Sequence, residues 1–368
     1  MSSSLSHKLS NEDIAAEPEE TFAAPYHIQG TGIFATPASI VSATGSIGLA
    51  LILWVVGALI ASAGTAVYLE WATAIPRSGG EKNYLEFYFR RPAYLITCVY
   101  AAYAALLGWP AGNSVYAGEM LLNAANTEVD RWNQRAIGVA VITFALILHG
   151  ALPKWGLRLQ NVLGLFKIVV LLFIIITRSM HIKFFYLADL NTNPQSKHVK
   201  AGAPSPSNFK NAFAGSKSDA NSFVSALYNV IWSYIGYSNA FYSMFFAAVP
   251  KEVILTSERL IASEFFTRMF GETAGRAISV IIALSAIGNV LAVLFGQGRV
   301  NQELGREGVL PFSKFFASNR PFNSPFAGLA LQWAVALIIM LAPPGGDAYS
   351  FLLSESIWLE AAELLNVC

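Results

Sequence analysis

The chain has 368 residues and a formal net charge of +1, and 54% of its residues are hydrophobic while only 13% are charged. Soluble domains carry about a quarter charged residues, so this chain cannot cover its own surface with polar groups, and a lipid bilayer is its natural partner. The near-neutral charge gives no indication of a nucleic-acid partner. The two cysteines, Cys98 and Cys368, form neither a zinc motif nor a disulfide framework, and Cys98 is expected to be a small core residue.

The first twenty residues are polar and acidic and lack the basic and apolar regions of a signal peptide. We expect residues 1–29 to be a cytoplasmic tail with an altered start. A membrane-spanning helix needs about 20 mostly apolar residues, and residues 21–69, which contain no Asp, Glu, Lys or Arg, are long enough for two. The first of these spans is interrupted by Gly30, Gly32 and Pro37, and the second covers about 48–75.

Further apolar runs predict six more spans, which makes about eight hydrophobic segments in an all-α integral membrane protein. They cover residues 93–122, 136–152, 159–176, 222–249, 273–295 and 325–341. The polar stretch 177–221 is too long for a tight turn, so it is expected outside the membrane. A Pro-Pro-Gly-Gly sequence ends the pattern, and residues 343–368 form a divergent tail.

Lysine and arginine in short loops indicate the orientation, because such loops remain in the cytoplasm. Three clusters follow the second span, the fourth span and the span 273–295: Arg77, Lys82, Arg90 and Arg91; Lys154 and Arg158; Arg299, Arg306, Lys314 and Arg320. With a cytoplasmic N-terminus the first two clusters are inside, but the third follows an odd-numbered span. Either 222–249 crosses twice, which its length does not allow, or one crossing is missing there.

Lys167 lies in the middle of an apolar run, where a charge costs several kcal/mol. It is expected to face the protein interior, either as a fixed cation beside a substrate or ion pathway or as a structural lysine that joins two helices. Two other titratable groups give weaker evidence of a functional site. Glu119 is expected at a wet helix end, and His149 is expected to be structural.

Two helix interruptions point to a binding site. Gly30-Thr31-Gly32 could expose amide groups for a carboxylate at the start of the next helix, or could be a close helix-packing contact. Residues 233–239, which include Ser233, Tyr234 and Gly236, form a second polar interruption five spans later. Paired broken helices in corresponding positions indicate a transporter site at the middle of the membrane. The sequence contains no catalytic, metal-binding or phosphate-binding pattern, so neither an enzyme nor a cofactor or metal is expected.

Four segments resemble the amino acid–polyamine–organocation superfamily, and in particular its L-type amino acid transporter branch. Gly30 to Phe34 is similar to the unwound motif of the first helix, residues 70–85 to the stretch after helix two, residues 158–167 to helix five, and residues 301–311 to the loop before helix nine. Within the branch, the chain resembles fungal high-affinity methionine permeases. The likeness extends over residues 30–342.

The resemblance implies a LeuT-type fold of two inverted five-helix repeats, with helices one and six broken around the substrate. It implies that Gly30, Thr31, Gly32 and Ile33 hold the substrate carboxylate. The stretch Ser233, Tyr234 and Gly236 would receive the amino group, with Trp232 as an aromatic gate. Lys167 would occupy the place of a sodium ion and brace the first helix against the fifth.

The chain departs from the family pattern near residues 244–245, where the rest of helix six and most of helix seven have no counterpart. Helices ten to twelve also have none, so the copy is expected to be truncated. Two functions remain open. One is a plasma-membrane permease for a neutral amino acid, methionine or another large one, by alternating access and with protons as a possible driver. The other is a transport-inactive fragment that acts at most as a membrane-bound partner.

Overall fold

The computed structural model describes residues 36–75, 81–89, 91–92, 94–108, 110–167, 169–170, 211–234, 263, 266–267 and 271–342. Within these ranges every regular element is a helix and no strand is present. Helical stretches long and apolar enough to cross a membrane cover Ile47–Trp71, Leu95–Ala124, Arg131–Ala151 and Glu272–Arg306. The predicted all-α membrane class is therefore confirmed.

The helices follow one another along the chain with short connections where these are described. They are α2 (Pro37–Thr44), α3 (Ile47–Ala74), α4 (Glu81–Tyr88), α5 (Leu95–Leu106), α6 (Pro110–Ala124), α7 (Arg131–Ala151), α9 (Ala220–Tyr234), α13 (Glu272–Arg306), α14 (Ser313–Phe316) and α15 (Phe326–Leu341). Residues 153–167 and 169–170 are also helical. The predicted tail 1–29, the segment 343–368 and the break near 244–245 lie outside the described residues.

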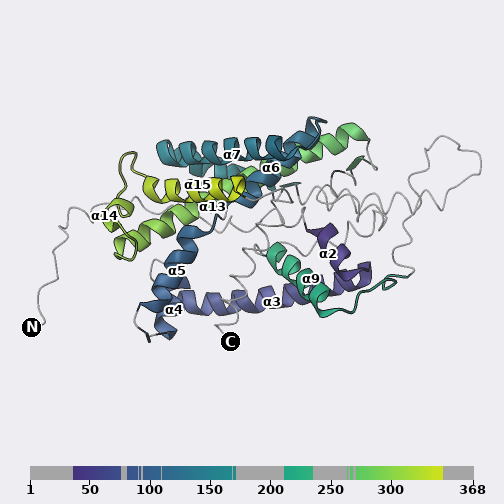
Figure 1. Cartoon of the computed structure of the whole chain (residues 1–368), viewed down its shortest axis with the longest axis horizontal. Coiled ribbons are helices and arrows are strands. Elements are labelled where there is room, and N and C mark those ends of the chain that lie inside the picture. Colours follow the sequence, from purple (N-terminus) through teal and green to yellow (C-terminus); the bar gives the residue numbers. More distant parts are fainter. Residues whose placement is uncertain are drawn as a thin grey trace, which may run out of the picture.

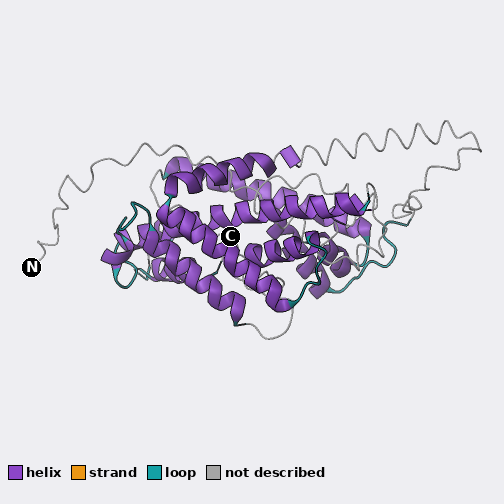
Figure 2. Cartoon of the chain, turned by 90° about the horizontal axis from the view of Figure 1, so that it is seen from above, coloured by secondary structure: helices purple, strands orange, loops and turns teal. Residues whose placement is uncertain are grey.

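The helices form two layers (Figure 1). In the first, which we call the α13 layer, α6, α7, α13 and α15 pack against one another. In the second, the α3 layer, α2 and α9 pack together, and both contact α3. Helix α5 contacts α4, α13 and α15, and so connects the end of the α3 layer with the α13 layer. Figure 2, seen from above, shows that the described elements are helices joined by loops and turns.

One hydrophobic core joins the two layers. Ile40 of α2 and Leu53 of α3 belong to the same buried cluster as Val115 of α6 and Ile282 of α13. Within the α13 layer the helices approach to backbone contact, because a Cβ atom at Gly118 would collide with the carbonyl oxygen of Gln134. Small residues at such crossings are typical of helix packing in membranes, where no hydrophobic effect drives association.

Local sequence explains why α2 ends and α3 begins where they do. Gly45 adopts a left-handed conformation (φ +73°) that ends α2, and the Ser46 hydroxyl accepts a hydrogen bond from the Leu49 amide as the N-cap of α3. α3 then continues for 28 residues without a break. At 1.5 Å per residue this is about 42 Å, which exceeds the ~30 Å of a bilayer core.

The structure corrects two predicted helix boundaries. The expected single helix over 93–122 is interrupted at residues 107 and 108, where Leu107 is extended and Gly108 lies against Ala336 of α15. Pro110, which has no amide hydrogen, then starts α6. The span 273–295 is also longer than expected, because α13 continues to Arg306 and therefore includes two of the residues assigned to the basic loop.

Two predictions about individual side chains are wrong. Cys98 is exposed on α5 and is not a core residue. Glu119 is buried, with 4% of its surface exposed, and its Oε2 accepts a hydrogen bond from Gln134 Nε2 at 3.1 Å. The donor from α7 offsets part of the cost of burying this carboxylate. His149 is fully buried and packs on Phe295 of α13, at 5.0 Å between ring centroids.

Candidate functional site

The half-helices α2 and α9 meet inside the protein. The hydroxyls of Thr36, which precedes α2, and Ser233, near the end of α9, are 2.6 Å apart and buried, with 1% and 2% of the residues exposed. Ser233 Oγ also donates to the Asn229 carbonyl oxygen at 2.8 Å. Because that bond uses the serine proton, Thr36 must be the donor to Ser233. Two segments 197 residues apart in sequence are thus held together at one buried point.

Opposite helix ends come together at this point. The N-terminus of α2 carries a partial positive charge, and the C-terminus of α9 carries a partial negative charge. The Thr36 side chain makes no capping bond to α2, and Pro37 has no amide hydrogen, so the first amides of α2 are not satisfied by a local side-chain cap. The pair of ends matches the two charges of a zwitterion.

The other ends of α2 and α9 are also joined. The Lys217 amide donates to the Thr44 carbonyl at 2.9 Å, and the Lys217 ammonium donates to the Ser42 carbonyl at 2.8 Å. The hydroxyls of Ser46 and Ser216 are 2.6 Å apart. α2 and α9 are therefore joined at both ends, by the buried Thr36–Ser233 pair at one end and by the hydrogen bonds at the α2–α3 turn at the other.

The structure describes only part of the predicted substrate site. Ser233 lies at the meeting point of the two half-helices. Trp232 and Tyr234 are in α9, but their side chains lie outside the described part. The remaining predicted residues, Gly30, Thr31, Gly32, Ile33 and Gly236, also lie outside it. Sequence reasoning missed Thr36, although a threonine directly before the Pro37 helix start is a recognisable signal.

Lys167 is buried in helix 153–170, with 6% of its surface exposed. It lies against α13, because a Cβ atom at Gly288 would be 3.5 Å from Lys167 Cε and 3.0 Å from Leu163 Cβ. The glycine therefore leaves room for the lysine stem at the α13 surface. No cluster of three His, Cys, Asp or Glu residues that could bind a metal occurs among the described residues.

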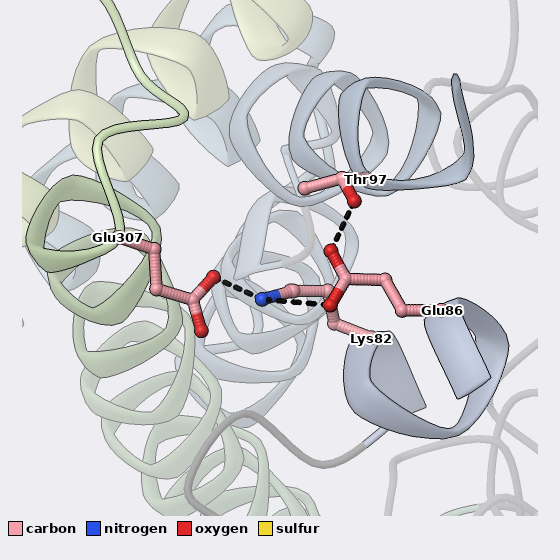
Figure 3. A network of polar contacts seen from close by, with 4 residues as sticks. All are labelled: Lys82, Glu86, Thr97 and Glu307. Carbon is pink, nitrogen blue, oxygen red and sulfur yellow. Dashed lines mark hydrogen bonds and ion pairs between the residues drawn. The ribbon is translucent and has the colours of Figure 1, made fainter. Parts of the chain in front are cut away.

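A second group of polar contacts lies where α4 meets the C-terminal end of α13 (Figure 3). Lys82 of α4 forms ion pairs with Glu307, the C-cap residue of α13, and with Glu86, whose carboxylate is 3.4 Å away. Glu86 in turn accepts a hydrogen bond from the Thr97 hydroxyl of α5. Only 5% of Lys82 is exposed. The sequence identified Lys82 only as a loop cation and did not identify Glu307, although both lie in segments that resemble the family.

A family model described as "Amino acid permease" matches residues 22–244 and 242–361. The chain belongs to this family. The predicted resemblance to the amino acid–polyamine–organocation superfamily is thereby confirmed. With its membrane-length helices, this amino acid permease family member is an integral membrane protein.

Curated relatives include two transporters from Saccharomyces cerevisiae. A high-affinity methionine permease is 47% identical over 352 aligned residues, covering 87% of this chain and 59% of the relative. A low-affinity methionine permease is 32% identical, covering 89% of this chain and 64% of the relative. A human cystine/glutamate transporter is 25% identical over 90% of this chain and 68% of its own length. The chain therefore spans about three fifths of the length of the two methionine permeases.

The alignments contain positions without a residue from this chain. The alignment with the high-affinity permease has 352 positions but uses 87% of 368 residues, about 320, which leaves about 32 positions unmatched. The same arithmetic for the low-affinity permease, 356 positions against 89% of 368 or about 328, leaves about 28. The family match also divides at residues 242–244, close to the predicted break.

Proposed function

We propose that the chain is an amino-acid permease whose substrate binds where α2 and α9 meet. The observation that carries the proposal is the buried Thr36–Ser233 hydrogen bond, which brings the N-terminus of one half-helix to the C-terminus of another. The α2 end favours a carboxylate and the α9 end favours an ammonium group. Gly30, Thr31 and Gly32 would extend the carboxylate site, and Ser233 to Gly236 would extend the ammonium site.

The proposed substrate is a neutral amino acid, methionine or another large one. Support comes from the two yeast methionine permeases that this chain resembles at 47% and 32% identity. Transport would proceed by alternating access, with the α3 layer rocking against the α13 layer around the site. Lys167 would brace the first helix against helix 153–170, protons would drive uptake, and no chemical reaction would be catalysed.

The proposed location is the plasma membrane, with the N-terminus in the cytoplasm. The basic residues near the ends of α3 and α13 favour the cytoplasm for that face of the molecule.

Uptake of labelled methionine tests this function. The chain would be expressed in yeast that lacks its own methionine permeases, with surface delivery measured separately by labelling in intact cells. Saturable uptake that unlabelled methionine and leucine reduce, and that arginine and glutamate leave unchanged, is the expected result. Surface-delivered protein without uptake above background would reject transport by this chain.

The alternative is a transport-inactive permease fragment that acts only as a membrane-bound partner. The roughly 30 unmatched alignment positions favour it, because a crossing missing from a site wall would expose unpaired backbone. Substrate binding separates the two. A fragment that retains the α2–α9 site without a transport cycle would bind methionine in detergent but not accumulate it in cells. A transcript encoding another span after Met244 would reject the fragment reading.

A further inference from the structure

The loop between α13 and α15 packs on α13 with one side and exposes aromatic rings on the other. Leu310 of this loop is buried in the hydrophobic cluster at the end of α13, and Phe316 packs against the same cluster. Phe316 also fixes α14 to α13, because a Cβ atom at Gly305 would be 2.6 Å from the Phe316 Cβ. Phe312 and Phe315, which lie between the two anchored residues, are 83% and 64% exposed. The loop is therefore firmly attached while two of its phenylalanine rings point away from the protein.

The backbone at Phe312 holds its ring in this exposed position. Phe312 has a left-handed conformation, with φ +59° and ψ +38°, which is uncommon for a bulky side chain. The Ser313 hydroxyl donates to the Leu310 carbonyl oxygen and so closes the turn around Phe312. Backbone strain of this kind is retained mainly at functional positions, so the exposed ring is a candidate contact with a partner.

The loop lies at the depth of the lipid headgroups. α7 has 21 residues, or about 32 Å, which matches the ~30 Å bilayer core. The Ser324 hydroxyl ties the loop to the C-terminal end of α7 by donating to the Gly150 carbonyl at 2.7 Å. α14 lies just beyond the ends of α7 and α15 (Figure 1), and each headgroup layer is about 5–8 Å thick. Aromatic residues are enriched at this depth, and Trp155, which follows α7, is also exposed here.

Basic side chains without an acidic partner lie beside the exposed rings. Lys314 of α14 and Arg320 are exposed and form no ion pair with the described residues. The acidic residues at the end of α13, Glu303 and Glu307, are each engaged in an ion pair already. The loop therefore presents uncompensated positive charge together with aromatic surface.

The opposite ends of α7 and α13 have a different charge balance. Acidic residues outnumber basic ones among the described residues around the α6–α7 connection and the start of α13: Glu128, Asp130 and Glu272 against Arg131 and Arg276. An anionic partner at headgroup depth would therefore favour the end that carries α14.

We propose that the loop between α13 and α15 binds an anionic phospholipid. Lys314 and Arg320 contact the negatively charged headgroup, and the rings of Phe312 and Phe315 lie among the first carbons of the acyl chains. The positive charge favours an anionic lipid over a zwitterionic one, and the exposed rings favour a lipid over a free phosphate. Anionic lipids are concentrated in the cytoplasmic leaflet, the side proposed for this end of the molecule. The inference does not depend on transport.

Lipid binding to the full chain tests the proposal. Fluorescent phosphatidylserine would be titrated with the detergent-solubilised protein and followed by anisotropy, with unlabelled phosphatidylserine and phosphatidylcholine as competitors. Phosphatidylserine should compete and phosphatidylcholine should not. A basic residue beside an anionic headgroup contributes about fivefold in affinity, so Lys314→Gln and Arg320→Gln should each weaken binding by about that factor.

Arg306→Gln is the matched control for these two variants. It removes the same charge at the same end of the molecule, but from a residue that already pairs with Glu303 at 2.7 Å. Binding should change little. Equal losses for all three variants would mean that the lipid responds only to net charge, and equal competition by phosphatidylcholine would mean that the site is not anion-selective. Either result would overturn the proposal.

The aromatic part of the site has its own control. Phe312→Ser and Phe315→Ser should also weaken phosphatidylserine binding severalfold, because each removes an exposed ring without changing the charge. Trp132→Ser removes a ring of similar exposure, 58%, from the start of α7 at the opposite end, and it should leave binding unchanged. Losses as large for Trp132→Ser would contradict a site at α14.

The depth of the loop gives a readout that does not depend on affinity. In a background with Cys98→Ser and Cys368→Ser, a spin label at Phe315→Cys would be studied in nanodiscs that contain phosphatidylserine. The label should be more accessible to oxygen, which dissolves in lipid, than to a water-soluble nickel complex. A label accessible mainly to nickel would place the loop in water and refute the proposal. A label shielded from both until the acidic residues 1–20 are deleted would assign the surface to that segment instead.

Discussion

The longest helices of the α13 layer and the α3 layer, α13 and α3, are similarly apolar but differ in how much protein surrounds them. In the most apolar window of α13, 72% of the residues are buried, against 33% for α3. Residues of α3 such as Leu59 and Leu69 are about two-thirds exposed, as expected for side chains that face lipid. The α13 layer also contains the backbone-to-backbone crossings at Gly118 and Gly328. The difference indicates a rigid frame, the α13 layer, and a less constrained α3 layer that carries the proposed α2–α9 site.

The largest effect should come from filling a helix crossing of the frame. A Cβ atom at Gly328 of α15 would collide with the Gly298 carbonyl oxygen of α13, so Gly328→Ala must separate the two helices. Overpacking costs about 1–3 kcal/mol even where side chains can adjust, and here the neighbour is backbone. Little monodisperse protein is expected in fluorescence-detected size-exclusion chromatography.

The matched control for that change lies in the α3 layer. Gly64 of α3 has no atom within 4 Å of an added Cβ. Gly64→Ala should therefore be neutral, or should stabilise the helix by about 0.5–1 kcal/mol. Equal losses for the two variants would mean that the layers do not differ in packing.

Lys167 should be needed for transport more than for folding. Lys167→Ala is expected to lower methionine uptake at least tenfold, about 1.4 kcal/mol, while the surface level falls much less. Lys154→Ala, at an exposed position near the start of the same helix, is the control and should have no effect. Undiminished uptake by Lys167→Ala would make the lysine a structural residue only.

The next largest effect on uptake should come from removing the hydroxyl pair between α2 and α9. Thr36→Val keeps the side-chain shape and removes the donor, and Ser233→Ala removes the acceptor. A buried group left without its partner costs about 1–3 kcal/mol, so each variant should reduce uptake several-fold. Because the two residues share one bond, the double variant should cost less than the sum. Ser62→Ala, which removes an exposed hydroxyl of α3, is the control.

The ion pairs of Lys82 should contribute to stability where α4 meets the end of α13. Glu307→Gln leaves a buried ammonium with Glu86 as its charged partner at 3.4 Å. Because about a third of the Glu307 side chain is exposed, the loss should lie between that of a surface pair and that of a buried pair, about 1–2 kcal/mol. Thermal unfolding in detergent measures it. Arg306→Gln breaks an exposed pair with Glu303 and should lower the melting temperature less.

The smallest expected effect is on thermal stability and comes from a side-chain cap at the start of α9. Hydrogen bonds from the Ser222 side chain and amide hold the pKa of Asp219 below its ordinary value of 3.8. A lowered pKa stabilises the fold above the unfolded-state pKa, and this stabilisation is lost as the pH falls through the folded-state value. Asp219→Asn should therefore melt slightly below the unmodified chain at pH 7. The difference should shrink below about pH 4, and a constant difference would contradict the charge-based cap.

Local sequence features predicted much of this molecule. Apolar runs gave the second span almost to the residue, since α3 covers Ile47–Ala74 against an expected 48–75. The broken first and sixth helices followed from glycines and polar residues in uncharged stretches. Residues 30–32 and 235–239 lie outside the described part of the chain, so the two breaks stay predictions. The family followed from four motif segments. Each of these features is encoded within one stretch of chain.

Other features depended on contacts between distant segments. Cys98 was assigned to the core and faces outward, since lipid is as apolar as a protein interior and hydropathy cannot separate the two environments. Glu119 was expected to be wet but is buried, and Gln134 of the neighbouring α7 donates a hydrogen bond to it. Sequence alone therefore determined that the chain is a permease-like helical membrane protein. Tertiary structure decided which helix faces meet protein, because burial is a property of the neighbours and not of the segment itself.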